Sequence, residues 1–139
     1  MLDATNREHA AAEERLRSDL IAWLTTVTAH GQPQSTPVWF LWEDDGFLIY
    51  SRPGMPKLDN IAANPKVSVH LRGTDAGDEI ATFDGTAELP GDQPPADRVH
   101  DYVSKYREQM ERFGWSPAKF AELYSEPIRV TPTEARIWE

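Results

Sequence analysis

A cluster of cationic residues marks the turn between a predicted strand and a predicted short helix. Between Arg52 and Arg72 the chain has four lysines and arginines and a single acid, although the protein as a whole carries a net charge of −9. Backbone N–H groups and the positive end of a helix dipole would reinforce these cations. The cluster therefore favours a bound anion such as a phosphate, and a solvated basic turn is the alternative.

Three side chains of this cluster have the chemistry that an anion site needs. Lys57 and Asn60 lie three residues apart on the predicted helix, so an ammonium and an amide donor share one face. Arg52, at the strand end, adds a planar guanidinium that matches phosphate oxygens. In the alternative, Asn60 caps or solvates the helix and Lys57 points into water.

The aromatic strand at 35–42 is the second candidate element, because it contains Pro37. Proline cannot donate to a strand ladder, so it indicates an edge, a bulge or a place where something else meets the backbone. Alternation puts Val38 and Phe40 on one face and Trp39 on the other. A flat aromatic ligand fits against such a strand, and so does an ordinary barrel core.

Several kinds of active site are excluded by the residues at hand. The chain has four histidines, none at a metal-ligand spacing with another histidine or a carboxylate, and it has no cysteine. The Gly-x-Ser-x-Gly elbow, the phosphate-binding Gly-x-x-x-x-Gly-Lys loop and the Gly-x-Gly-x-x-Gly turn are all missing. We therefore expect no metal site and no catalytic side-chain constellation.

Composition predicts one globular domain over 1–139, because 40% of the residues are hydrophobic and the length suits a single core. The acidic balance argues against nucleic-acid binding, which needs an extended basic surface. No apolar run is long enough to cross a bilayer, and no signal peptide is visible. We expect a cytoplasmic protein that binds a small molecule.

The order of the predicted elements favours a mainly β fold with peripheral helices, an antiparallel split β-barrel. The second and third strands form a hairpin around a tight turn, and the final segment contains two short strands. The expected elements are an N-terminal helix within 1–20, strands at 21–29, 34–43, 47–51, 67–72 and 79–89, helices at 56–64, 96–113 and 116–124, and returning strands within 127–138.

Taken together in order, these pieces resemble the pyridoxamine-phosphate-oxidase-like proteins, the split β-barrel superfamily that binds flavins and deazaflavins. The resemblance covers about residues 20–138, and the second strand with the cationic turn looks most like an actinobacterial branch that uses coenzyme F-420. The matching pieces are Trp23-Leu-Thr-Thr-Val27, Gly31-Gln-Pro33, Pro37-Val-Trp-Phe40, Gly46-Phe-Leu-Ile-Tyr-Ser51, Lys57-x-x-Asn-Ile61, Asn64-Pro65, Val67-Ser-Val69 and Gly85-Thr-Ala87.

The resemblance implies roles for seven cofactor-binding residues, and Arg52 is an eighth candidate because of its charge and position. Lys57 and Asn60 match positions that hold the cofactor phosphate. Tyr50 and Ser51 match the strand end beside the ribityl chain. The strand under the cofactor ring is matched by Val38, Trp39 and Phe40.

The implied function is hydride transfer from reduced F-420 to a small conjugated or quinone-like acceptor. Relatives that bind flavin mononucleotide (FMN) commonly have Ser-Arg-Lys where this chain has Met55-Pro56-Lys57, so FMN is the alternative cofactor. A flavin- or tetrapyrrole-binding protein without turnover is the alternative function. The resemblance also implies a homodimer with the cofactor shared between subunits.

Overall fold

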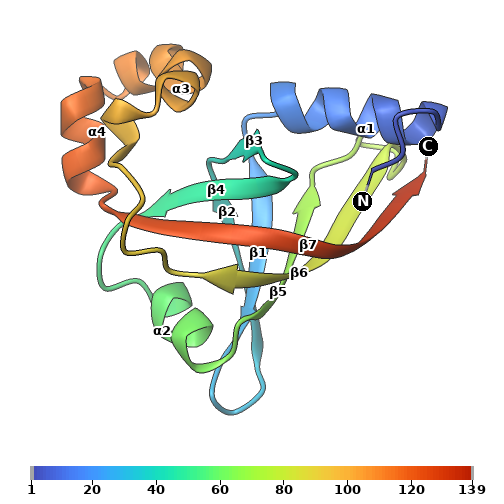
Figure 1. The fold of residues 1–139 in the computed structure, drawn as a ribbon, viewed down its shortest axis with the longest axis horizontal. Helices are drawn as coiled ribbons and strands as arrows, with labels where there is room; N and C mark the ends of the chain where they lie inside the picture. The colour runs from blue at the N-terminus through green and yellow to red at the C-terminus, as the bar shows by residue number, and fades with distance from the viewer. Residues whose placement is uncertain (1, 139) are drawn as a thin grey trace.

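A seven-stranded antiparallel sheet organises the fold in the computed structural model, which describes residues 2–138 (Figure 1). Along the sheet the strands follow the order β2-β1-β5-β6-β7-β4-β3, and every neighbouring pair is antiparallel. The elements are α1 (Arg7–Ser18), β1 (Ala22–Val27), β2 (Pro33–Val38), β3 (Leu41–Glu43), β4 (Gly46–Ser51), α2 (Pro56–Ala63), β5 (Lys66–Leu71), β6 (Ile80–Glu88), the 3-10 turn η1 (Ala96–Arg98), α3 (His100–Arg112), α4 (Pro117–Leu123) and β7 (Glu126–Trp138).

The sheet curls around one apolar core, and part of its other face packs against a second, smaller core. The inner core contains residues from α1 and from all seven strands. Leu16, Phe40 and Phe83 in it are at most 1% exposed. The outer core lies where α3 and α4 cover β3 and β4, and Tyr102 and Tyr106 are fully buried in it. The predicted split β-barrel with peripheral helices is confirmed.

The expected single strand at 34–43 is wrong, because the structure divides it at Trp39 and Phe40. Strand β2 pairs with β1 and strand β3 pairs with β4, so the two pieces lie at opposite ends of the sheet order. The predicted hairpin is correspondingly limited to β3 and β4, around a tight turn in which Asp44 and Asp45 have φ values of 52° and 54°. Both residues are aspartates, which tolerate this left-handed conformation better than most.

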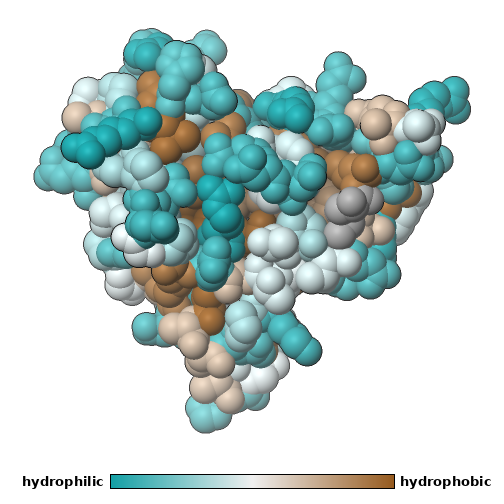
Figure 2. Space-filling model, in the orientation of Figure 1, coloured by the Kyte–Doolittle hydropathy of each residue, from teal (hydrophilic) through white to brown (hydrophobic). Residues whose placement is uncertain are grey.

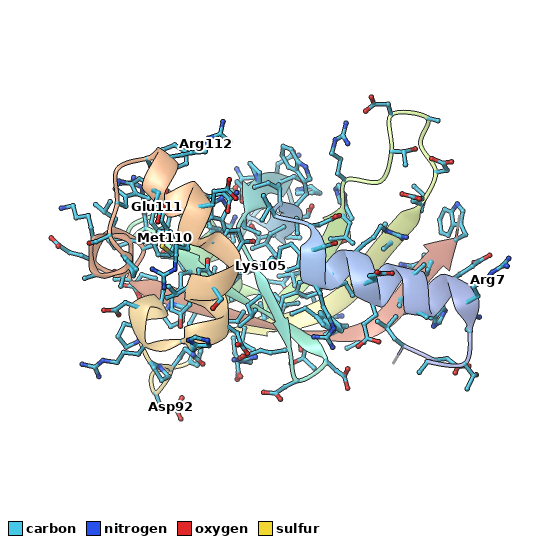
Figure 3. All side chains as sticks on the ribbon, turned by 90° about the horizontal axis from the view of Figure 1, so that it is seen from above. Arg7, Asp92, Lys105, Met110, Glu111 and Arg112 are labelled. Carbon is cyan, nitrogen blue, oxygen red and sulfur yellow. The ribbon has the colours of Figure 1, made fainter. Side chains whose placement is uncertain are left out.

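Side chains from α3 replace the missing ladder bonds at this division. The Phe40 N–H donates to the Tyr106 hydroxyl oxygen at 2.8 Å, and the Lys105 ammonium donates to the Phe40 carbonyl at 2.8 Å. The Tyr106 hydroxyl in turn donates to the Leu20 carbonyl at 2.7 Å. Lys105 lies on the side of α3 that faces α1 (Figure 3). Phe40 therefore keeps a partner for its N–H and for its carbonyl although it lies outside the strands.

Two further boundaries differ from the predictions. Residues 126–138 form the single long strand β7, which pairs with both β4 and β6. Strand β7 is not interrupted where two strands were predicted; its pairing with β6 instead shifts register beside Gly85. A Cβ at Gly85 would lie 2.7 Å from the Thr131 carbonyl oxygen. Glycine is thus required there for close approach of the backbones. The predicted helix at 96–113 is likewise divided into η1 and α3 at Val99.

We expect Tyr106→Phe to lower the free energy of unfolding by roughly 1–3 kcal/mol, because it leaves the buried Phe40 N–H without a partner. Chemical denaturation of the variant and of wild type measures this difference.

Tyr102→Phe is the matched control on the same helix. The Tyr102 hydroxyl is buried and makes no hydrogen bond among residues 2–138, so its removal should be neutral or stabilising. Equal losses in the two variants would show that the hydroxyl of Tyr106 contributes nothing particular to the division of the strand.

Candidate functional site

A cavity of about 490 Å³ opens where β2 and β4 end, beside the start of α2 and the turn between α3 and α4. Apolar side chains gather at the surface between the α3–α4 region and α2, on the left of the molecule (Figure 2). The cavity is lined by six of the eight residues that the sequence predicts to bind a cofactor, namely Val38, Trp39, Tyr50, Ser51, Arg52 and Lys57.

Two cations line this cavity, and neither forms an ion pair with a described carboxylate. Arg52 and Lys57 line it, and the lining residues of the described chain include no aspartate or glutamate. Burial lowers the pKa of Lys57, because desolvation disfavours the ammonium. No ion pair joins either residue to a carboxylate within residues 2–138. An anionic ligand would supply the missing opposite charge.

Arg52 also contacts the helical segment across the cavity. Its guanidinium carbon lies 4.8 Å from the centre of the Tyr124 ring, a cation–π contact. The preceding residue, Ser51, is 2% exposed, and its hydroxyl donates to the Arg52 carbonyl at 2.9 Å. The cation–π contact joins the residue after β4 to Tyr124, the residue at which α4 ends.

Asn60 lies outside the cavity lining, although it shares the short helix with Lys57. Its side-chain nitrogen donates to the Thr26 hydroxyl and to the Gln34 amide oxygen, at 3.0 Å each, and the residue is 8% exposed. Thr26, Gln34 and Lys57 line a second hollow of about 410 Å³, which shares Met55 and Lys57 with the first. Asn60 therefore fixes the β1–β2 hairpin that forms a wall of the second hollow.

The aromatic strand end is positioned by stacking. The Trp39 ring stacks on Tyr106 with ring centres 4.5 Å apart and on Phe120 with centres 5.2 Å apart. Phe40 points the other way, into the inner core at 0% exposure, so its side chain does not line the cavity. Val38 and Phe40 both belong to the inner core, whereas Trp39 packs against the outer one, as the predicted alternation requires.

The helical segment contributes an aromatic wall to the cavity that the sequence does not predict. Phe113, Trp115, Phe120 and Tyr124 all line the cavity. Phe113, Phe120 and Tyr124 have the spacing of ordinary helix packing, which hides their second role. The signal that could have found them is Trp115, a large aromatic in a Gly-containing turn between two predicted helices.

Tyr50 connects the cavity to the linker that precedes the helical segment. Its hydroxyl donates to the Pro94 carbonyl at 2.6 Å and accepts from the Gln93 amide at 3.2 Å. Burial raises the pKa of this hydroxyl. The ring of Tyr50, with its hydroxyl thus engaged, forms part of the cavity wall.

Other kinds of site are not found within residues 2–138. No group of three or more histidine, cysteine, aspartate or glutamate side chains there could hold a metal ion. None of the helices in the same part of the chain combines the length and the apolar character that crossing a membrane demands.

The family model for pyridoxamine 5'-phosphate oxidase matches residues 9–139. No curated protein sequence matches the chain.

Solved structures share the fold. The crystal structure of conserved hypothetical protein Rv2991 from Mycobacterium tuberculosis has a TM-score of 0.74 at 21% identity, covering 96% of this chain and 85% of that one. A structure titled F420 Reductase has a TM-score of 0.63 at 26% identity, covering 89% and 94%. HutZ, a heme storage protein from Vibrio cholerae, has a TM-score of 0.67 at 18% identity, covering 96% of both chains.

We expect Asn60→Ala to lower the free energy of unfolding by roughly 1–3 kcal/mol, because Thr26, at 1% exposure, loses its buried partner. Lys57→Ala, three residues away on the same helix, should leave stability unchanged or raise it, since it removes a partly desolvated charge. Urea denaturation of both variants measures the contrast. If Lys57→Ala lowered stability and Asn60→Ala did not, the Asn60 hydrogen bonds would not be what stabilises this helix against the β1–β2 hairpin.

Proposed function

Because the chain belongs to the pyridoxamine 5'-phosphate oxidase family, we propose that it is an oxidoreductase that uses coenzyme F-420 to reduce a small conjugated, quinone-like acceptor. The observation that carries this proposal is the pairing, in one cavity, of two cations that lack acidic partners with a wall of aromatic rings. Such a cavity suits a molecule with a flat ring system and a negatively charged tail.

The residues present fit that cofactor. Arg52 and Lys57 would hold anionic groups of the tail, and Ser51 and Tyr50 would lie beside the polyol chain. Val38 and Trp39 would support the ring. We assign Asn60 and Phe40 supporting roles, because the first is hydrogen-bonded to the β1–β2 hairpin and the second packs in the inner core.

Reduced F-420, when bound, supplies a hydride to the acceptor, which takes up one proton from solvent, and the cofactor is left oxidised. The chain's part is to orient both molecules and to limit water in the cavity. Histidine and carboxylate side chains are missing from the cavity lining of the described chain. We therefore assign no proton donor to the protein.

The choice of F-420 over FMN rests on the start of α2. Met55 and Pro56 stand where FMN-binding relatives commonly have serine and arginine. Met55 lines both hollows with an apolar side chain, and Pro56, in the first turn of the helix, has no N–H to donate. The second hollow adds room beyond Lys57, with Thr26 and Gln34 among its lining residues, as a longer tail would need. The structure titled F420 Reductase supports the same choice.

Two competing functions remain open to test. An FMN enzyme of this fold would purify with a yellow flavin spectrum. A heme storage protein shares the fold, and the second alternative is a binding protein without turnover. Such a protein would bind F-420 while no acceptor oxidises the reduced form.

We also propose a homodimer, in which a second copy covers the outer face of β1, where Trp23 is 36% exposed.

We expect Lys57→Ala to weaken F-420 binding by roughly 1–3 kcal/mol, or about fivefold to 150-fold in Kd, because a charge-assisted contact is lost. Titration of F-420 fluorescence measures Kd. Lys66→Ala is the control, since Lys66 is exposed on β5 and does not line the cavity. Equal affinities for wild type and Lys57→Ala would remove the cationic turn from the proposal.

Binding should also depend on pH through Lys57. Burial lowers the pKa of its ammonium, so the charge that attracts an anion is lost at a lower pH than for an exposed lysine. Kd should therefore begin to rise with pH below the ordinary lysine pKa of about 10.4. Lys57→Arg stays charged over this range and should give a flatter curve. Parallel curves for the two proteins would contradict the role of the ammonium.

A further inference from the structure

Two aromatic rings of the cavity lining lie at the turn between α3 and α4. We call Phe113 and Trp115 the aromatic rim. Both line the cavity, and their rings stack on each other with centres 4.8 Å apart. Phe113 is nevertheless 62% exposed, more than any other large hydrophobic residue of the described chain. An exposed aromatic at the mouth of a cavity indicates a contact surface rather than core packing.

The aromatic rim is held in place by the ends of both helices. α3 ends in the region of Arg112 (Figure 3), and Gly114 follows with a φ of +74°, the left-handed conformation that glycine adopts without strain. The Trp115 N–H donates to the Met110 carbonyl at 2.9 Å. The Ser116 hydroxyl then caps α4 by accepting from the Lys119 N–H at 3.1 Å. The two rings therefore project from a short, doubly capped turn.

The aromatic rim is separated from the cations by an intervening ring. Arg52 contacts Tyr124, and Tyr124 lies 5.8 Å from Trp115 between ring centres. The aromatic rim also borders Trp39, the residue proposed to support the cofactor ring, because the ring centres of Phe113 and Trp115 each lie 6.4 Å from that of Trp39. An acceptor must lie against the cofactor ring to receive a hydride, so it needs a surface of its own in the same cavity.

We propose that Phe113 and Trp115 form the acceptor subsite, where they stack on the planar ring of an uncharged conjugated acceptor of the quinone class. The identity of the acceptor bound at this subsite rests on the proposed function. The same cavity is lined by Arg52 and Lys57 and, among the described residues, by no carboxylate, which disfavours an acceptor ring with a positive charge. The subsite selects for flatness and conjugation, since stacking depends on both.

The test uses menadione as the acceptor and the variants Phe113→Leu and Phe113→Tyr. Phe113→Leu should raise KM for menadione roughly threefold to tenfold, the size of one lost aromatic contact, with kcat little changed. Phe113→Tyr keeps the ring and should retain the wild-type KM. The Kd for F-420 should stay the same in both. Trp138→Leu is the control, because Trp138 is 50% exposed at the C-terminal end of β7.

A second measurement does not need the cofactor. Menadione should quench the tryptophan fluorescence of the cofactor-free protein in a saturable way, and Phe113→Leu should weaken that binding. If F-420 fails to bind but this quenching depends on Phe113, the proposed function fails while the subsite stands. If reduced F-420 is oxidised by menadione with an unchanged KM in Phe113→Leu, the subsite is overturned while the function stands. A loss of F-420 affinity in Phe113→Leu, or no saturable quenching of wild type, also overturns it.

Discussion

The anchoring of Phe40 by two side chains of α3 is the constraint on which the rest of the structure depends. Tyr106 accepts from the Phe40 N–H, and Lys105 donates to the Phe40 carbonyl. These bonds let one aromatic segment leave β2 and enter β3 at the far end of the sheet order. They also fix Trp39 beside Tyr106, so the same anchor shapes the barrel, joins the helices to it and places one wall of the cavity.

Lys105 bears an energetic cost in this arrangement. Burial lowers its pKa to about 8, against a partial offset from Asp19. Its ammonium also lies 3.7 Å from the centre of the Phe40 ring, a cation–π contact that compensates part of the desolvation. A charged group in this position is tolerated because the carbonyl and the ring of one residue, Phe40, both interact with it.

The cavity reverses the electrostatic character of the protein. The chain is acidic overall, with a net charge of −9, yet the described residues that line the cavity include Arg52 and Lys57 and no carboxylate. A partly desolvated ammonium without an ion-pair partner is costly. An anion bound there would lower that cost, which links the stability of the site to its ligand. The aromatic rings of the helical segment form another part of the lining of the same cavity.

The sequence by itself determined the fold class, most strand and helix positions, and the cationic turn at the start of α2, because these depend on local periodicity, proline and glycine placement, and charge. Tertiary structure alone decided which of those residues face the cavity. Asn60 shares a helix with Lys57, but its side chain meets the β1–β2 hairpin. Trp39 and Phe40 are adjacent, yet one lines the cavity and the other fills the core. Phe113 and Trp115 join the site because the helical segment folds back over β3 and β4, a long-range packing choice that no local pattern encodes.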